Sequence, residues 1–340
     1  MDESGFAKLK ATIRRDLTAE QCVELAAELQ RLAAERRAEV ELAERARALR
    51  DRQRCPHCGG LDVVGHGRDR LGRQRWRCRP GGGCGRTFGI LVGTPFSGMR
   101  MPEKWVACAE AMVRHVSVAK MAETLDVTRQ TAWRWRQRFL RVPAQTQAAT
   151  LGGVIEADET FFRSSYKGSR GWKRGTPPES RPPRYRGGTA LRSGLSGEQI
   201  PVLTALDRGG GIVEAVLPAR TRRAIEVALQ QRIAAGSVLC SDGAKGYVEA
   251  AVAADSEHRR IMTPRRDWLA KAIGGKPRRK GRLGLGQVNA HHQRLKSFVN
   301  GMARGVSTRH LPLYLGWSRA IRSPDFDPIT LVRNALTTTK

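Results

Sequence analysis

The sequence predicts a multidomain α/β protein in which a mixed β-sheet flanked by helices follows an N-terminal helix, a zinc ribbon and a helix-turn-helix. Three observations predict this order. Cysteines occur in two close groups between residues 55 and 84, helical apolar spacing fills residues 118–139, and short apolar runs alternate with a helical segment after residue 152. We therefore divide the chain into an N-terminal helix (1–53), a zinc ribbon (54–100), a helix-turn-helix domain (101–150) and an α/β domain with basic insertions (151–340).

The composition indicates an acidic partner. Among 340 residues, 61 are Lys or Arg and 32 are Asp or Glu, which gives a net charge of +29. Nucleic acid is the commonest partner of so basic a chain. Hydrophobic residues make up 40% of the chain, enough for a sizeable core, and no apolar run reaches the roughly 20 residues of a membrane span. The start lacks a secretory pattern and the 7 cysteines are an odd number, so we expect a reducing, cytoplasmic location.

The first 53 residues predict a helix with one apolar face. Thr18 followed by Gln21 has the pattern of a capping box at a helix start. An apolar stripe at three- and four-residue steps then runs along Cys22, Leu25, Leu29 and Leu32. Such a stripe is typical of a dimerisation helix, or of a helix that packs on its own protein or lies along DNA.

Residues 54–100 predict a structural zinc site. Cys55 and Cys58 form one close group, and Cys78 and Cys84 form another about 20 residues later. This spacing suits a tetrahedral site with four thiolate ligands, and a core this small needs metal to fold. Replacement of one ligand by His57 or His66 is the minor alternative.

Residues 118–139 predict a helix-turn-helix. A short helix over 118–125 is followed by a turn at Asp126-Val127 and a second helix over 128–139. Thr128 caps the second helix, which leaves Arg129 and Gln130 at its exposed start, with Arg134 further along. Side chains at this place in a recognition helix read base edges. We expect Trp133 to lie in the core.

The segment after residue 152 predicts a mixed sheet with two acidic strand ends. Apolar runs at 153–158, 200–206, 211–217 and 237–242 indicate strands, and 221–235 has helical spacing. Asp158 and Asp242 each end such a run, so their carboxylates can meet at one edge of the sheet and hold Mg²⁺.

Two further parts of this segment supply candidate residues. A predicted helix after residue 286 carries Asn289, His292 and Lys296 on one face. Two basic segments, 163–192 and 264–282, are typical of loops that bind phosphate. The first of them contains our candidate phosphate contacts, which are Lys167, Arg181, Arg184 and Arg186.

In these motifs the sequence resembles the zinc-ribbon DDE transposases of bacterial insertion sequences, the fifteen ninety-five group. The resemblance covers about 55–317, most of the chain. Its matching stretches, in order, are Cys55–Cys58, Arg75–Cys78, Gly93–Phe96, Ile155–Thr160, Cys240–Tyr247, Val288–Lys296 and Arg304–Thr308.

The resemblance implies an RNase H-like catalytic domain over 151–340. It further implies a DNA transposase that cuts the ends of an insertion sequence by metal-dependent hydrolysis and joins the 3′-hydroxyl to target DNA. Mg²⁺ or Mn²⁺ would be the catalytic cofactor, terminal repeats and target DNA the partners, and a homodimer or larger assembly the active form. The alternatives are a catalytically inactive zinc-ribbon and helix-turn-helix regulator and, less favoured, a nuclease acting on RNA or hybrids.

Position by position, the resemblance places the two catalytic aspartates at Asp158 and Asp242. The third acid of the family falls at His292, and its basic residue falls at Lys296. Imidazole suits Mg²⁺ less well than carboxylate does. His292 is therefore a weak ligand or a proton shuttle, or the ligand is Asn289 or His291, or this copy is no longer active.

Overall fold

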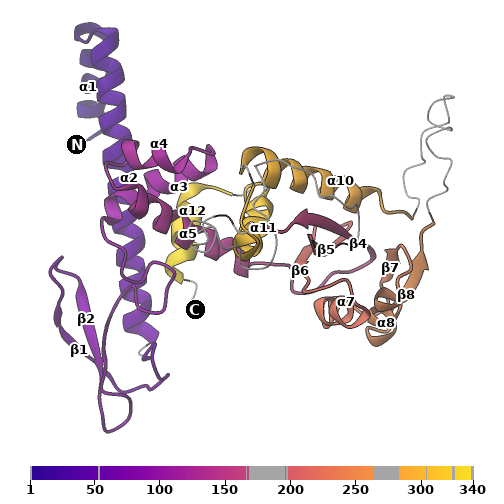
Figure 1. Cartoon of the computed structure of the whole chain (residues 1–340). Coiled ribbons are helices and arrows are strands. Elements are labelled where there is room, and N and C mark those ends of the chain that lie inside the picture. Colours follow the sequence, from indigo (N-terminus) through magenta and orange to yellow (C-terminus); the bar gives the residue numbers. More distant parts are fainter. Residues whose placement is uncertain are drawn as a thin grey trace, which may run out of the picture. The chain divides into compact units, whose positions relative to one another are not determined.

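The computed structural model describes residues 2–52, 54–165, 167, 196, 198–262, 283–303, 305–323 and 326–337. The chain forms two compact units, one of residues 1–142 with 323–340 and the other of residues 143–322 (Figure 1). Within the described ranges, no helix is both long and apolar enough to cross a bilayer.

The first unit begins with two helices, α1 (Glu3–Asp16) and α2 (Ala19–Arg52). The predicted capping box forms, because the Thr18 amide donates to Gln21 Oε1 at 2.9 Å and the Gln21 amide donates to Thr18 Oγ1 at 3.3 Å. In the apolar stripe, Leu29 and Leu32 are exposed. The later part of α2 instead supplies the packing face, where Leu42 is buried.

The C-terminal helix α12 (Pro328–Thr337) belongs to this first unit and packs on α2 and α3 (Trp105–Val113). An ion pair between Arg333 and Glu41, at 2.8 Å, joins α12 to α2. The last residues of the chain therefore complete the core of the N-terminal unit.

The cysteine-containing segment forms a small antiparallel sheet. Its strands are β1 (Val63–Arg68), β2 (Gln74–Cys78) and β3 (Thr87–Gly89), hydrogen-bonded in that order. Trp76 stacks on Phe88 across β2 and β3 with ring centroids 6.1 Å apart, and both side chains are buried. Within the three strands, the buried residues are Trp76, Cys78 and Phe88, so the sheet itself has a small apolar core.

The expected pair of helices follows as α4 (Val118–Thr124) and α5 (Arg129–Gln145), after a short 3-10 helix (Pro102–Lys104) and α3. Thr128 accepts from the Thr131 amide at 3.2 Å and so caps α5 as predicted. The expectation for Trp133 was wrong: 42% of its surface is exposed, and Trp135 is the buried tryptophan. Ala132, Trp135 and Phe139 form the packed face of α5, and Trp133 lies off it.

The second unit is built on a mixed five-stranded sheet of order β6-β5-β4-β7-β8. The strands are β4 (Val154–Arg163), β5 (Gln199–Asp207), β6 (Ile212–Val216), β7 (Val238–Ser241) and β8 (Glu257–Arg260). β4, β5 and β6 are antiparallel, whereas β7 pairs parallel to β4 and β8 parallel to β7. This is the RNase H-like arrangement that the resemblance implied.

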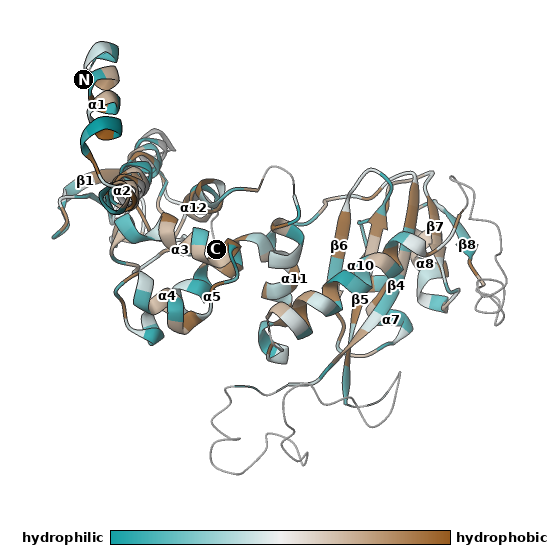
Figure 2. Cartoon of the chain, turned by 90° about the horizontal axis from the view of Figure 1, so that it is seen from above, coloured by the Kyte–Doolittle hydropathy of each residue, from teal (hydrophilic) through white to brown (hydrophobic). Residues whose placement is uncertain are grey.

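Helices cover both faces of this sheet (Figure 1). One face carries α7 (Arg222–Leu229) and α8 (Lys245–Ala253), over an apolar core that includes Ile155, Ala157 and Leu203. The other face carries α10 (Gly286–Lys296), which packs on β4 and β5. The central strands are accordingly rich in hydrophobic residues (Figure 2).

The chain continues from α10 through a π-helix (Ser297–Met302) and a 3-10 helix (Thr308–His310) into α11 (Leu311–Ala320), which packs on β6. The candidate phosphate contacts Arg181, Arg184 and Arg186, and the basic segment 264–282, lie outside the described residues.

Candidate active site

Asp158 and Asp242 lie on neighbouring strands at the same level of the sheet. The parallel pairing of β4 with β7 ends at Glu156 and Cys240, and each aspartate lies two residues further along its own chain. Asp242 directly follows β7, as the apolar run before it predicted, but β4 continues to Arg163 in its pairing with β5, so the prediction that Asp158 ends its strand was wrong. Because β4 and β7 run in the same direction, the two carboxylates still come together where β7 ends.

A third carboxylate joins them. Asp158, Glu159 and Asp242 each place an oxygen within 4.8 Å of the other two. The Glu159 side chain is 1% exposed and that of Asp242 is 41% exposed, so the cluster reaches from the interior to solvent. Nothing in the sequence assigned Glu159 a role, since it follows Asp158 and its side chain starts from the other face of β4.

Arg220 contacts two of these acids. Its Nε donates to Glu159 Oε2 at 3.0 Å, and a terminal nitrogen donates to Asp242 Oδ2 at 2.7 Å. Arg220 directly precedes Thr221, whose hydroxyl caps α7 by accepting from the Ala224 amide. The start of α7 therefore fixes where the guanidinium enters the cluster.

The crowding of acids changes their titration. Burial, followed by the neighbouring carboxylates of Glu159 and Asp242, raises the pKa of Asp158 from an ordinary 3.8 to about 6. Burial also raises the pKa of Glu159, although Arg220 opposes that rise. A site whose carboxylates resist ionisation together has a deficit of positive charge, which a divalent cation would supply.

The turn that carries Asp242 is held from the adjacent strand. Ser241 Oγ lies 2.9 Å from His258 Nε2 on β8 and accepts from the Gly243 amide at 3.1 Å. Gly243 has φ +89°, which disfavours other residues, and a Cβ there would lie 2.6 Å from the Arg260 side chain. Glycine is thus needed directly after Asp242.

Helix α10 is anchored over the sheet at its first turn. Glu156 Oε2 accepts from the backbone amides of Gln287 and Val288 at 2.8 and 3.1 Å, so a carboxylate on β4 caps the helix start. Glu156 and Asp158 lie on the same face of β4, since side chains alternate along a strand. The helix therefore begins next to the strand that carries the first aspartate.

His291, one of the sequence-based alternatives for the third ligand, is already paired. Its Nε2 lies 2.8 Å from Glu214 Oε1 on β6, and the other Glu214 oxygen accepts from Arg319 on α11. The Glu214 and His291 side chains are 1% and 2% exposed. This buried network ties β6, α10 and α11 together, and the sequence did not reveal it.

His292 is buried beside His291, and its Nε2 has no hydrogen-bond partner among the described residues. Burial, with the nearby charges of His291 and Lys296, lowers the pKa of His292 to about 4, so the ring is neutral at pH 7. Among the residues that the structure describes, no histidine is part of the group formed by Asp158, Glu159 and Asp242.

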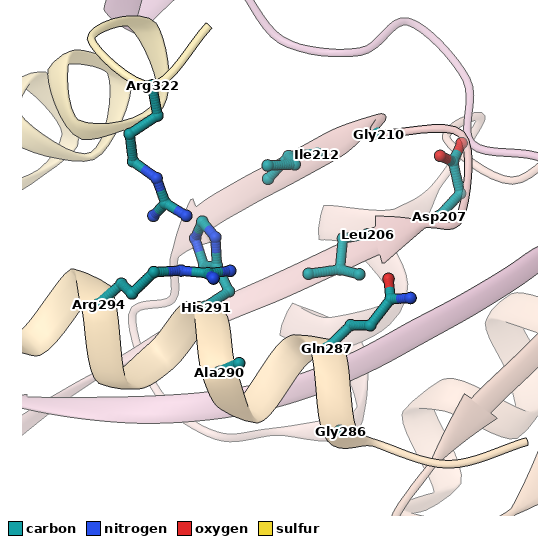
Figure 3. A pocket seen from close by; sticks show the side chains of 10 residues that line it. All are labelled: Leu206, Asp207, Gly210, Ile212, Gly286, Gln287, Ala290, His291, Arg294 and Arg322. Carbon is teal, nitrogen blue, oxygen red and sulfur yellow. The ribbon is translucent and has the colours of Figure 1, made fainter. Parts of the chain in front are cut away.

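Asn289 and Lys296 are exposed and seven residues apart, which places them on one flank of α10. The other flank borders an open pocket, whose lining includes Leu206, Ile212 and Arg294 (Figure 3). Leu206 pairs with Glu156, two residues before Asp158 on β4. The flank with Asn289 and Lys296 therefore lies away from the pocket, and neither residue is among the pocket's lining.

The pocket in Figure 3 is not the carboxylate site. Arg294 and Arg322 lie on one side of it with His291, and Asp207 lies at the other end. Asp158 and Asp242 are not among its lining residues.

The four predicted cysteines meet at one point of the first unit. The sulfurs of Cys55 and Cys84 are 3.6 Å apart, those of Cys58 and Cys78 are 3.7 Å apart, and all four lie within 4.8 Å of one another. A tetrahedron with Zn–S bonds of about 2.3 Å has edges of about 3.8 Å, so the spacing fits zinc. Among the residues that the structure describes, neither His57 nor His66 belongs to this group of cysteines.

The candidate DNA contacts within the described ranges are exposed. Arg129, Gln130 and Arg134 project from α5 into solvent. Lys167 lies in the second unit, where its Nζ donates to the Gly305 carbonyl at 3.1 Å.

Comparison with known proteins supports the resemblance. Residues 150–317 match the ISXO2-like transposase domain, a segment that begins before β4, extends into α11 and contains the carboxylate cluster. No curated protein gave a match to the chain. Residues 150–317 therefore form a domain of the ISXO2-like transposase family.

Proposed function

We propose that this transposase cuts the ends of an insertion sequence by metal-dependent hydrolysis and joins the freed 3′-hydroxyl to target DNA. The observation that carries the proposal is the meeting of Asp158 and Asp242 at one edge of an RNase H-like sheet. The family membership supports a transposase in general, and this geometry supports the finer mechanism.

The donor set suits divalent cations. Asp158 and Asp242 offer hard carboxylate oxygens that lie close together, which Mg²⁺ and Mn²⁺ prefer. When bound there, such ions activate a water or hydroxyl nucleophile and stabilise charge on the phosphate. The ionised form of Asp158 dominates above pH 6, so its carboxylate is ready to bind metal at neutral pH.

The remaining parts of the site would orient DNA. Asn289 and Lys296 share an exposed flank of α10, and the first turn of that helix is capped by Glu156, two residues before Asp158 on β4. This favours Asn289 over the buried His292 as the third residue of the site. Lys296 would hold a phosphate next to the cleaved bond. His291 is paired with Glu214, which argues for a structural role.

The first unit would bring the DNA. We propose one Zn²⁺ in the ribbon, held by Cys55, Cys58, Cys78 and Cys84, and base contacts from Arg129, Gln130 and Arg134 at the start of α5. Lys167 and the arginines of the basic segments would bind the DNA backbone. Two ends must be joined in one reaction, so we propose a homodimer or larger assembly, with the exposed stripe of α2 as its contact.

The experiment is a cleavage and joining assay with labelled insertion-sequence ends in Mg²⁺, comparing the unaltered protein with Asp158→Ala and Asp242→Ala. We expect 3′-hydroxyl nicks and joined products from the unaltered protein and none from either variant, while DNA binding stays intact. Full activity in either variant would refute the proposed mechanism. End-specific binding without cleavage by the unaltered protein would instead support the regulator alternative.

A further inference from the structure

The guanidinium of Arg220 lies within the acidic cluster, where a divalent cation must compete with it for the carboxylate of Asp242. It holds Asp242 Oδ2 at 2.7 Å, and the other oxygen of that carboxylate accepts from the Ala244 amide at 3.0 Å. Both oxygens of Asp242 are thus engaged in the protein without metal.

Glu159 keeps Arg220 there. The Glu159 side chain is 1% exposed, and a buried carboxylate needs a cation beside it. Partial burial acts to lower the pKa of Arg220, but the carboxylates of Glu159 and Asp242 outweigh it and raise that pKa. The arginine is therefore a fixed positive charge among three acids.

Arg220 can also reach outward. Its side chain is 25% exposed and its second partner, Asp242, is 41% exposed, so the guanidinium lies at the solvent side of the cluster. A DNA phosphate that enters the site meets this same side, because the interior side is closed by Glu159. Arginine is well suited to exchange a carboxylate for a phosphate, since the same planar fork fits both.

We propose that Arg220 is the counter-ion of Asp242 in the metal-free protein and that its guanidinium passes to a DNA phosphate when a divalent cation takes that carboxylate. The inference rests on the proposed function, because it assumes that Asp242 binds metal. It adds an active-site residue outside the predicted set and makes metal and DNA binding mutually reinforcing.

The direction in which Mn²⁺ affinity changes when Arg220 is replaced separates a competing counter-ion from a residue that only positions Asp242. Mn²⁺ affinity of the full-length protein without DNA would be measured from the electron paramagnetic resonance signal of free Mn²⁺. We expect Arg220→Gln to bind Mn²⁺ about tenfold more tightly than the unaltered protein, because the competing charge is gone. Arg220→Lys keeps the charge and should stay within about twofold of the unaltered protein.

Arg222→Gln is the matched control. Arg222 lies two residues away and has the same charge, but it pairs with Glu249 on the surface of α7 and α8. Its substitution should leave Mn²⁺ affinity within about twofold. Unchanged or weaker Mn²⁺ binding by Arg220→Gln would overturn the proposal and make Arg220 a support for Asp242.

Addition of a DNA duplex of random sequence tests whether the Arg220 guanidinium passes to a DNA phosphate. The duplex should strengthen Mn²⁺ binding more in the unaltered protein and in Arg222→Gln than in Arg220→Gln, since only Arg220 transfers from carboxylate to phosphate. An equal gain in all three proteins would refute the transfer.

Arg220→Gln leaves the buried Glu159 unpaired and could unfold the protein. The comparison is therefore repeated in a protein that carries Glu159→Gln. Glu159→Gln and the double variant Glu159→Gln, Arg220→Gln differ only at Arg220, and the double variant should again bind Mn²⁺ about tenfold more tightly. If neither the variants nor the unaltered protein bind Mn²⁺ at the cluster, the proposed function itself fails. If the unaltered protein cleaves DNA in a metal-dependent reaction but Arg220→Gln binds Mn²⁺ more weakly, this inference is refuted and the proposed function stands.

Discussion

His291 Nε2 and Glu214 Oε1 lie 2.8 Å apart between α10 and β6, and both side chains are almost fully buried. Arg319 approaches the other oxygen of Glu214 from α11. This pairing fixes α10 across the sheet, and α10 carries Asn289 and Lys296.

Removal of Glu214 should destabilise the second unit strongly. Glu214→Ala leaves Arg319 and His291 buried without their acid, which costs about 3–5 kcal/mol. Glu226→Ala removes a partly exposed acid paired with the exposed Arg223 on α7 and should cost less than about 1 kcal/mol. Urea unfolding of both variants gives the comparison, and equal losses would show that the network adds little.

Asp158→Asn should stabilise the metal-free protein at neutral pH. Folding raises the pKa of Asp158 from 3.8 to about 6, so its contribution to stability is complete below pH 3.8 and is lost as pH rises through about 6. Asparagine avoids this loss. We expect a gain of about 1–2 kcal/mol above pH 6, after allowance for solvent screening, that vanishes toward pH 4.

Urea unfolding in EDTA across this pH range measures the effect. The ribbon cysteines would lose zinc to the chelator in both proteins, so the difference between them isolates Asp158. A stability gain of Asp158→Asn that grows as the pH falls would contradict a raised pKa of Asp158.

Asn289 should matter more for strand cleavage than His292. Single-turnover nicking of an end-containing duplex should fall by orders of magnitude in Asn289→Ala, because the proposed third residue of the site is removed. His292→Ala should retain cleavage in proportion to its folded fraction. The reverse pattern would return His292 to the site as the third ligand, and His292→Glu should then retain or restore activity.

The ribbon should hold one Zn²⁺ per chain. Substitution of Cys55 and Cys78 by alanine should abolish this zinc in elemental analysis and open the three-stranded sheet to proteolysis, since its strands bury only Trp76, Cys78 and Phe88. Cys22→Ser, outside the cluster, is the control and should keep the metal. Unchanged zinc in the double variant would exclude these ligands.

Sequence preference should depend on Arg129 and general DNA affinity on the basic segments. Arg129→Ala should relax the preference for insertion-sequence ends over random duplex, whereas Arg114→Ala, just after α3, should not. Joint replacement of Arg181, Arg184 and Arg186 should weaken all DNA alike and lower the salt slope by about 0.9 for each phosphate that is no longer neutralised. Fluorescence anisotropy at several salt concentrations measures both effects, and an equal loss on both duplexes for Arg129→Ala would rule out base reading.

The sequence predicted the two aspartates because the signal is local. An apolar run that stops at an acid indicates a strand end, and Asp242 does follow the end of β7. β4 instead continues past Asp158 to Arg163 in its pairing with β5, which the apolar run did not predict, but β4 and β7 are neighbours and bring the two acids together. The cysteine cluster was predictable for the same reason, since its spacing is written in one short segment. The capping box at Thr18 and the cap at Thr128 also depend only on nearby residues.

Partners from distant segments were not predictable. Nothing near Arg220 indicates that it pairs with Glu159, and nothing near Glu214 indicates His291, because a polar residue does not reveal which charge will neutralise it. β8 has the sequence Glu-His-Arg-Arg and lacks the apolar alternation of a strand. An amphipathic helix such as α12 likewise does not indicate which core it joins.

The alternation of acids along β4 has a consequence for insertions and deletions. Loss of one residue between Gly153 and Ala157 would shift the register and turn Asp158 toward α8, with Glu159 in its place beside α10. An acid would still occupy the site, but Arg220 would lose its buried anchor. A change of length in a connection outside the strands leaves this alternation intact, and the basic segments 163–192 and 264–282 follow β4 and β8.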